Sequence, residues 1–349
     1  MTATTHPTLD EDEDRNEDVD PVCSTSVGSW PGTDMADALS IAFAECPDLP
    51  YLPELPARGP HAQLVGRGSA FLSGMSVDLQ PAGWRLTDGS GREHRQAKAT
   101  LRSDLDQLEE VAQGYVGPFK FSFTGPWTLA ANMERPRGDR VIADSGARRD
   151  LGQSLVEGVT EVIGEMRRRL PDLRAVVQLD EPSLPAVAAG SVPTASGFSR
   201  HRSIKESEIA EIYTRLIDAL TAKEIGAAVV VHCCAPGVPI ELLHHAGLRG
   251  LSLDLDQLTT ADWDALGASM EQGLWLGAGA LPTSSAITAD QVSERVLRPV
   301  RGLGLDPVVS AQMFVTPACG LANADPAAAL QALRTVRTAA EIVTERLLE

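Results

Sequence analysis

The chain has 349 residues with 30 Lys and Arg against 48 Asp and Glu, so its formal net charge is −18, and 43% of its residues are hydrophobic. This composition predicts a globular protein with a large core and excludes the clustered cations that nucleic acid or an anionic membrane requires. No apolar run of spanning or signal-peptide type is present, and an odd number of cysteines favours reduced thiols, so we expect a cytoplasmic protein.

The N-terminal segment is strongly acidic. Residues 1–21 contain eight Asp and Glu, a single Arg and no aromatic residue. Charge repulsion in such a segment outweighs any burial, so we expect a disordered tail over 1–21. The remaining residues, 22–349, are then expected to form one folded domain.

From residue 115 onward, short apolar runs alternate with helical stretches, which is typical of repeated βα units. The expected strands lie at 23–27, 68–73, 119–123, 174–179, 227–231, 249–253, 273–277 and 310–315. The expected helices lie at 145–169, 204–223, 238–246, 260–270, 288–302 and 325–348. Segment 74–100 is polar, which predicts a hairpin or an irregular excursion from the first half of the domain. Eight strands favour a closed (β/α)8, TIM-barrel-like α/β domain, and the lack of a GxGxxG turn disfavours a dinucleotide-binding doubly wound sheet.

Metal-ligating residue types follow two of the expected strands. His232, Cys234 and Cys319 offer the imidazole and thiolate ligands that favour zinc, with Asp254 or Asp256 as a fourth, oxygen ligand. Alternation along an extended chain places His232 and Cys234 on one side and so favours Cys234 over its neighbour Cys233, which nevertheless stays open as a fourth ligand. The competing interpretation is that these buried-type residues only pack in the core.

Other polar residues stand at the ends of the first strands. Asp180 and Glu181 directly follow an apolar strand, where a carboxylate can hold an ammonium group or accept a proton. The alternative is that they cap the turn before Pro182. Ser29 follows the first strand, and there the alternative is ordinary turn chemistry.

Seven motifs occur in an order that is familiar from one family: VGSWPGT, TGPWTL, QLDEPSL, HCC, GLSLD, GAGALPT and VTPACGL. Over roughly residues 22–348 the chain resembles the C-terminal catalytic barrel of cobalamin-independent methionine synthase, in a single-barrel form. The resemblance implies a Zn²⁺ enzyme that transfers a methyl group to the sulfur of a small-molecule thiol, homocysteine, to give methionine.

By matching motifs, the resemblance implies roles for individual residues. His232, Cys234 and Cys319 would be zinc ligands, and Asp254 stands where the family has a Glu ligand. Asp180 would hold the homocysteine amino group and Ser29 would contact its carboxylate. Zinc coordination would present the substrate sulfur as a thiolate at neutral pH.

The chain departs from the family pattern at two positions that serve folate binding and proton delivery there. Asn132 replaces a Trp and Ser284 replaces a His. The methyl donor is therefore open between a folate and a methylcorrinoid presented by a partner protein. The rival functions are a methyltransferase for another thiol, a related decarboxylase, and an inactive zinc-binding barrel scaffold. No Arg-rich carboxylate clamp stands at the strand ends, which disfavours the decarboxylase.

Overall fold

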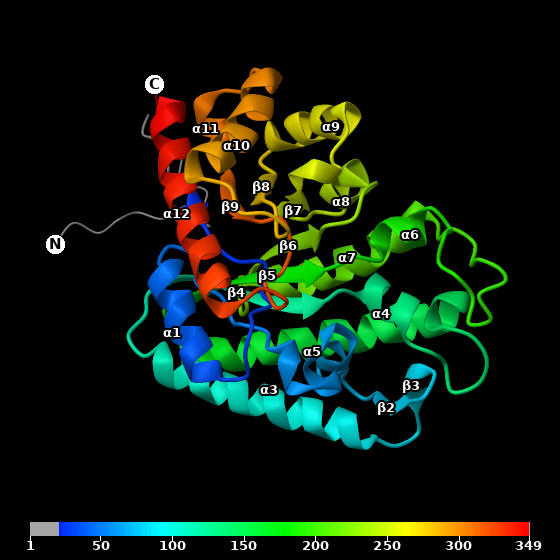
Figure 1. Cartoon of the computed structure of the whole chain (residues 1–349). Helices are drawn as coiled ribbons and strands as arrows, with labels where there is room; N and C mark the ends of the chain where they lie inside the picture. Colours follow the sequence, from blue (N-terminus) through cyan, green and yellow to red (C-terminus); the bar gives the residue numbers. More distant parts are fainter. Residues whose placement is uncertain (1–20, 349) are drawn as a thin grey trace.

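The computed structural model describes residues 21–348, so the predicted acidic tail lies outside the described residues apart from Pro21. Seven parallel strands form one curled sheet in the order β1-β9-β8-β7-β6-β5-β4, with helices packed outside it (Figure 1). The strands of this sheet are β1 (Cys23–Ser24), β4 (Gly117–Thr124), β5 (Leu173–Asp180), β6 (Ala228–Cys233), β7 (Gly250–Asp254), β8 (Trp275–Leu281) and β9 (Met313–Pro317). The α/β, TIM-barrel-like fold that the sequence predicts is confirmed.

An extended segment joins the two edge strands of the sheet and closes the barrel. Within residues 50–54, the Leu52 N–H donates to the Lys120 carbonyl of β4 at 2.9 Å. The Glu54 N–H donates to the Gly28 carbonyl, just beyond β1, at 3.1 Å. Both contacts are parallel bridges, so residues 50–54 take the place of the eighth strand.

The predicted strand at 68–73 is wrong. Helix α2 (Leu64–Ser69) and a following turn occupy these residues. Phe71 and Leu72 are buried in the main core through this turn, so the apolar run reflects burial without a strand. Gly68 allows the helix to lie against the end of β4, because a Cβ there would stand 2.6 Å from the Thr124 hydroxyl oxygen.

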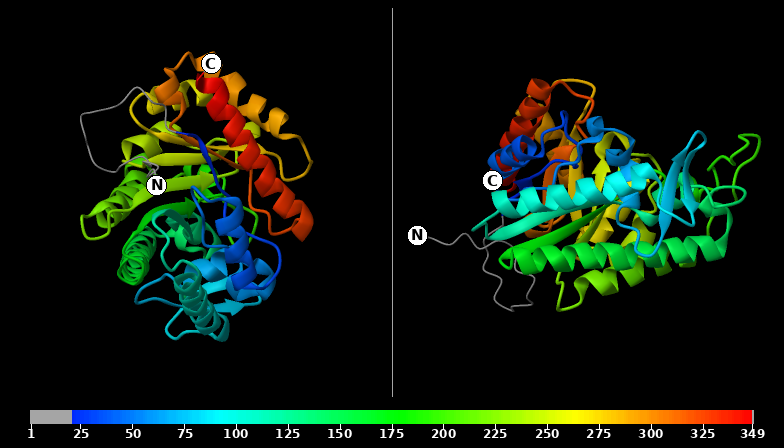
Figure 2. Two further views of the ribbon diagram at one scale, coloured as in Figure 1. Left: turned by 90° about the vertical axis from the view of Figure 1, so that its left-hand side faces the viewer. Right: turned by 90° about the horizontal axis from the view of Figure 1, so that it is seen from below.

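Segment 74–100 contains the predicted hairpin, formed by β2 (Ser76–Gln80) and β3 (Gly83–Thr87). Its last residues instead begin the long helix α3 (Arg92–Val111), which the sequence did not predict. Figure 2 shows the hairpin and the loop that follows α6 (Leu184–Ala188) projecting from one end of the molecule.

The helices of the second half lie where their periodicity predicts them. They are α5 (Ser145–Arg169), α7 (Glu206–Thr221), α8 (Ile240–His245), α9 (Thr260–Met270), α10 (Ala289–Leu303) and α12 (Pro326–Leu348). The remaining helices of five or more residues are α1 (Met35–Glu45), α4 (Pro126–Asn132) and the short α2 and α6. Capping boxes start α9 and α10, through Thr259 with Asp262 and Thr288 with Gln291.

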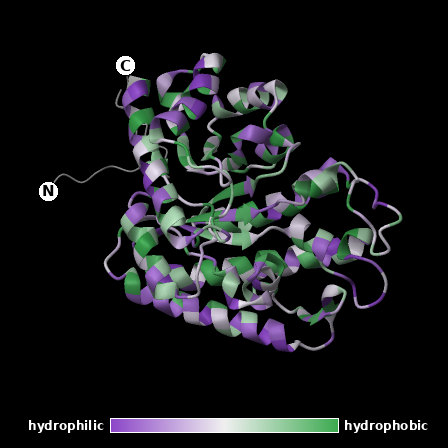
Figure 3. Cartoon of the chain, viewed as in Figure 1, coloured by the Kyte–Doolittle hydropathy of each residue, from purple (hydrophilic) through white to green (hydrophobic). Residues whose placement is uncertain are grey.

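Hydrophobic residues concentrate on the strands and on the inner helix faces, while the outer helix faces are largely hydrophilic (Figure 3). No helix within residues 21–348 is long and apolar enough to span a membrane. The main core is continuous across the sheet and its helices. The interior of the barrel also holds charged side chains, which are described with the site below.

Candidate metal centre

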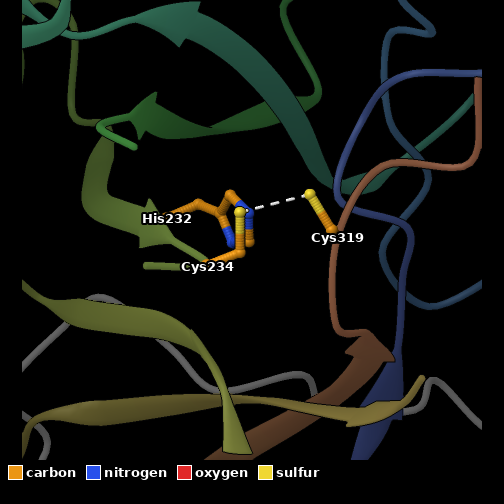
Figure 4. A group of neighbouring side chains, drawn as sticks. All are labelled: His232, Cys234 and Cys319. Atoms are coloured by element: carbon orange, nitrogen blue, oxygen red, sulfur yellow. Dashed lines mark hydrogen bonds between the residues drawn. The ribbon is translucent and has the colours of Figure 1, made fainter. Parts of the chain in front are cut away.

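Three potential metal ligands meet at the carboxyl ends of two strands that are not neighbours. His232 is the penultimate residue of β6, Cys234 directly follows this strand, and Cys319 follows β9. One ligand atom from each lies within 4.8 Å of the other two (Figure 4). The barrel therefore brings together residues that are 85 positions apart in the sequence.

The geometry fits a tetrahedral zinc site. Zn–S bonds of about 2.3 Å place two sulfur ligands about 3.8 Å apart, and the Sγ atoms of Cys234 and Cys319 are 3.2 Å apart. A small separation of the two side chains would therefore admit the ion. The Ser252 hydroxyl lies 3.2 Å from His232 Nδ1, which leaves Nε2 for a metal and fixes the ring orientation.

The two sulfurs are joined by a hydrogen bond. The hydrogen bond between Cys319 and Cys234, together with a hydrogen bond to His232, lowers the pKa of Cys319 to about 4. The same bond between the sulfurs and burial raise the pKa of Cys234. A cation between the two sulfurs would replace this shared proton, which is the exchange that zinc makes on binding thiolates.

The neighbouring cysteine faces away from the cluster. Cys233 is 1% exposed, and its Sγ lies 3.8 Å from the Ala235 carbonyl. Burial raises the pKa of Cys233 to about 12. Alternation along β6 thus places Cys234, and not Cys233, beside His232, as the sequence pattern indicates.

No carboxylate joins the three ligands within the described residues. Asp254 Oδ1 accepts from the Asp256 backbone N–H at 3.0 Å, and its Oδ2 accepts from Gln257 Nε2 at 3.3 Å. The Asp256 carboxylate pairs with Arg295. Ligation by Asp254 stays a prediction, and a zinc ion held by the three residues alone would keep one coordination position open.

Asp180 stands next to the metal ligands. It ends β5 opposite His232 in the register of β5 and β6, and it is 7% exposed. Its Oδ1 accepts from Gln178 Nε2 at 2.7 Å. Burial and the nearby Glu54 carboxylate raise the pKa of Asp180 to about 7, against the opposing effect of His232. The residue is thus a buried acid at the inner rim of the barrel.

Glu181 points to a different place. Its carboxylate is fully buried and accepts hydrogen bonds from the backbone N–H groups of Trp127 and Thr128, from the Thr128 hydroxyl and from the Tyr213 hydroxyl. Both backbone N–H donors belong to the first turn of α4, where a negative charge is stabilised by the helix dipole. Substrate binding by Glu181 stays a prediction, and its observed contacts tie the strand end to α4.

Ser29 lies beside the third metal ligand. The backbone of Ser29 accepts from the Leu321 N–H at 2.9 Å. A Cβ at Gly320 would stand only 2.0 Å from the Ser29 hydroxyl oxygen, so only glycine permits this approach. The structure therefore places Ser29 next to the turn that carries Cys319.

Charged residues that the sequence reasoning missed lie inside the barrel. Lys120 is fully buried on β4, and burial lowers its pKa to about 8. Glu54 and Arg67 form a buried ion pair at 2.6 Å, and Arg67 also donates to the Ser122 carbonyl at 2.7 Å. The signal was the run FKFSF, in which Lys120 and Ser122 alternate with phenylalanines and so point to the opposite side.

Asn132 and Ser284, the two positions that depart from the family pattern, lie in different parts of the structure. Asn132 Nδ2 donates to the Thr128 carbonyl at 2.8 Å and to the Ser183 hydroxyl at 3.1 Å, next to the end of β5. Ser284 is exposed in the loop between β8 and α10.

Comparisons with known proteins agree with this geometry. The family model described as the catalytic domain of cobalamin-independent synthase matches residues 132–342. A B12-independent methionine synthase from Shewanella sp. W3-18-1, solved in complex with selenomethionine, is 13% identical with a TM-score of 0.57, and the match covers 94% of this chain and 99% of that chain. A putative vitamin-B12 independent methionine synthase from Listeria monocytogenes is 15% identical with a TM-score of 0.60, covering 93% and 99%.

No curated protein sequence matches the chain. The two solved structures establish the fold at this low identity, whereas the family model spans more than half of the chain and includes all three residues of the metal-ligand cluster. The chain therefore belongs to the cobalamin-independent methionine synthase family and is a methyltransferase of that type.

Proposed function

We propose that this protein is a zinc-dependent methyltransferase that methylates the sulfur of homocysteine to give methionine. The observation that carries the proposal is the meeting of His232, Cys234 and Cys319 at the barrel mouth, beside the buried carboxylate of Asp180. When bound, zinc would supply Lewis acidity that keeps the substrate sulfur a thiolate at neutral pH.

The residues around the cluster suit the amino-acid end of such a substrate. Asp180 would receive the ammonium group, because its buried carboxylate lies one strand from His232. Ser29 would contact the substrate carboxylate, because it lies against the turn of Cys319. The substrate would then be oriented with its sulfur toward the three ligands, and the rim of the barrel would hold it in line with the donor. The neighbour from Shewanella was solved with selenomethionine, a molecule with the shape of this product.

The structure gives less information about the methyl donor than about the acceptor. Asn132 is engaged with Thr128 and Ser183, and Ser284 is exposed, so neither position supplies the Trp and His that the resemblance associates with folate. We therefore propose a methylcorrinoid, presented by a partner protein, as the donor in preference to a methylfolate.

A direct assay tests the reaction and the donor together. Zinc-loaded protein is incubated with homocysteine and either methylcobalamin or methyltetrahydrofolate, and methionine is measured by mass spectrometry. The proposal expects methionine with methylcobalamin, and little with methyltetrahydrofolate. Methionine from the folate alone would overturn the donor assignment. Methylation of 2-mercaptoethanol or another thiol in place of homocysteine would identify a different acceptor.

Two further functions are separated by this assay together with the zinc content of the purified protein. An inactive scaffold would bind zinc and homocysteine and yield no product with either donor. A decarboxylase would not need the metal cluster, so zinc content distinguishes it from the other two.

A further inference from the structure

Lys120 is a charged residue enclosed in the barrel with no exposure to solvent. Its ammonium group has three protons to donate, and three acceptors surround it. These are the backbone carbonyls of Ser26 and Val27, the latter at 3.0 Å, and Gln178 Oε1 at 2.7 Å. Each ammonium proton therefore has an acceptor, but transferring a cation from water into the protein interior still costs free energy. We therefore looked for a role of Lys120 that an apolar residue at this position could not perform.

The contact with Gln178 fixes the direction of a hydrogen-bond chain. Because an ammonium group can only donate, the Gln178 amide must turn its oxygen toward Lys120 and its NH2 group to the other side. That NH2 group donates to Asp180 Oδ1 at 2.7 Å and to the Val27 carbonyl at 2.7 Å. With Lys120 absent, the amide would lose the partner that holds its oxygen in place.

The chain ends on one oxygen of Asp180 and leaves the other open. Within residues 21–348, no side chain or backbone group donates a hydrogen bond to Asp180 Oδ2. The same ammonium group also holds the carbonyls of Ser26 and Val27, and Ser29 lies two residues after Val27. Lys120 is therefore connected to both residues that would receive the amino-acid end of the substrate.

We propose that Lys120 is a positioning residue for recognition of the substrate ammonium group: through Gln178 it holds the Asp180 carboxylate with one oxygen bound and the other presented to the substrate. This inference rests on the proposed function, because it takes an amino acid as the acceptor. Lys120 would thus contribute to substrate recognition without touching the substrate or the candidate metal ligands.

The test measures recognition of the ammonium group separately from recognition of the thiol. Dissociation constants of zinc-loaded enzyme are measured for homocysteine and for 4-mercaptobutyrate, which keeps the thiol and carboxylate and lacks only the amino group. The ratio of the two constants reports what Asp180 contributes. In Lys120→Met this preference for homocysteine should fall roughly tenfold or more, as expected for a weakened hydrogen-bond network to a charged group, with zinc content unchanged.

A second variant and a control separate positioning from stability. Gln178→Met keeps the side-chain length and removes the amide, so it should lower the preference to the same extent, and the double variant should lose little more. The control is Arg148→Met in α5. Arg148 is also a buried cation that makes three hydrogen bonds, two to Glu208 and one to the Ile142 carbonyl, but it lies outside the barrel. It should lower the melting temperature and leave the preference unchanged.

The outcomes are distinct. If folded Gln178→Met or Lys120→Met keeps the wild-type preference for homocysteine, the positioning role is overturned and the proposed function stands. If wild-type enzyme with zinc bound shows no such preference, the assignment of an amino-acid substrate fails, and the role of Lys120 fails with it.

Discussion

The two halves of this barrel contribute different kinds of chemistry to one site. The half formed by β6 to β9 has apolar strands, and its site residues are the soft ligands His232, Cys234 and Cys319. The half formed by β1, residues 50–54, β4 and β5 instead encloses charged groups, among them Lys120 and Asp180. The comparison indicates that metal binding and recognition of an amino acid are built on separate strands, so each can be removed without the other.

The largest expected effect comes from removing one metal ligand. Cys234→Ala should lose zinc and reduce the methylation rate by roughly a thousandfold or more, since a catalytic metal generates the reactive thiolate. Cys233→Ala is the matched control, because its sulfur faces away from the cluster. Zinc content by atomic absorption checks both variants. Equal zinc loss in the two would refute the assignment of Cys234.

Asp180→Asn should retain zinc and lose affinity for homocysteine. Loss of the negative charge should weaken homocysteine binding by about tenfold or more while zinc content stays at the wild-type level. Titration calorimetry on the zinc-loaded variant measures the change. If zinc were lost together with homocysteine binding, the two halves of the barrel could not be treated as independent.

Glu181→Gln is expected to act on stability. An amide can match some of the four donors around the fully buried carboxylate, but its NH2 group must face at least one other donor. We expect a loss of about 2 kcal/mol or more in the free energy of unfolding, measured by urea denaturation. A variant as stable as wild type, with weakened homocysteine binding, would instead favour the predicted substrate-binding role of Glu181.

Gly320→Ala tests the place where the two halves meet. The added Cβ would lie 2.0 Å from the Ser29 hydroxyl oxygen, so the serine side chain must move. Because a serine hydroxyl rotates easily, we expect a stability change within about 1 kcal/mol together with weaker homocysteine binding and unchanged zinc. Unaltered homocysteine binding would argue against a role for Ser29.

The smallest effect is expected for a change that belongs to the scaffold alone. Thr288→Ala removes the capping box of α10 and should cost about 1 kcal/mol of stability, with zinc and homocysteine binding unchanged. Thermal unfolding followed by circular dichroism measures this cost. A change in ligand binding would show that the outer helices influence the site.

The same contrast explains how much of the fold could be predicted. The strands from β4 onward are apolar runs flanked by clear breaks, and each was placed correctly to within a few residues. Residues 50–54 were missed because Pro50 and Pro53 lack N–H groups and interrupt the pattern of a strand. Only two isolated bridges pair the segment with its neighbouring strands. Such a short pairing does not require the alternation of apolar and polar residues by which a strand is recognised in a sequence.

The site divides in a similar way. Residue type and position at strand ends were enough to select His232, Cys234 and Cys319 as candidate metal ligands, and the structure brings these three side chains together. Lys120 and Gln178 could not be given a role from sequence, since a lysine in a strand ordinarily extends its ammonium group to water. Only closure of the barrel buries it and supplies its three acceptors.

The most direct test of the central claim is zinc X-ray absorption on the wild-type protein, before and after addition of homocysteine. The account predicts one zinc per chain, bound by two sulfurs and one imidazole of the His232, Cys234 and Cys319 cluster, with a third sulfur after homocysteine is added. Absence of zinc, or a sulfur count that homocysteine leaves unchanged, would contradict it.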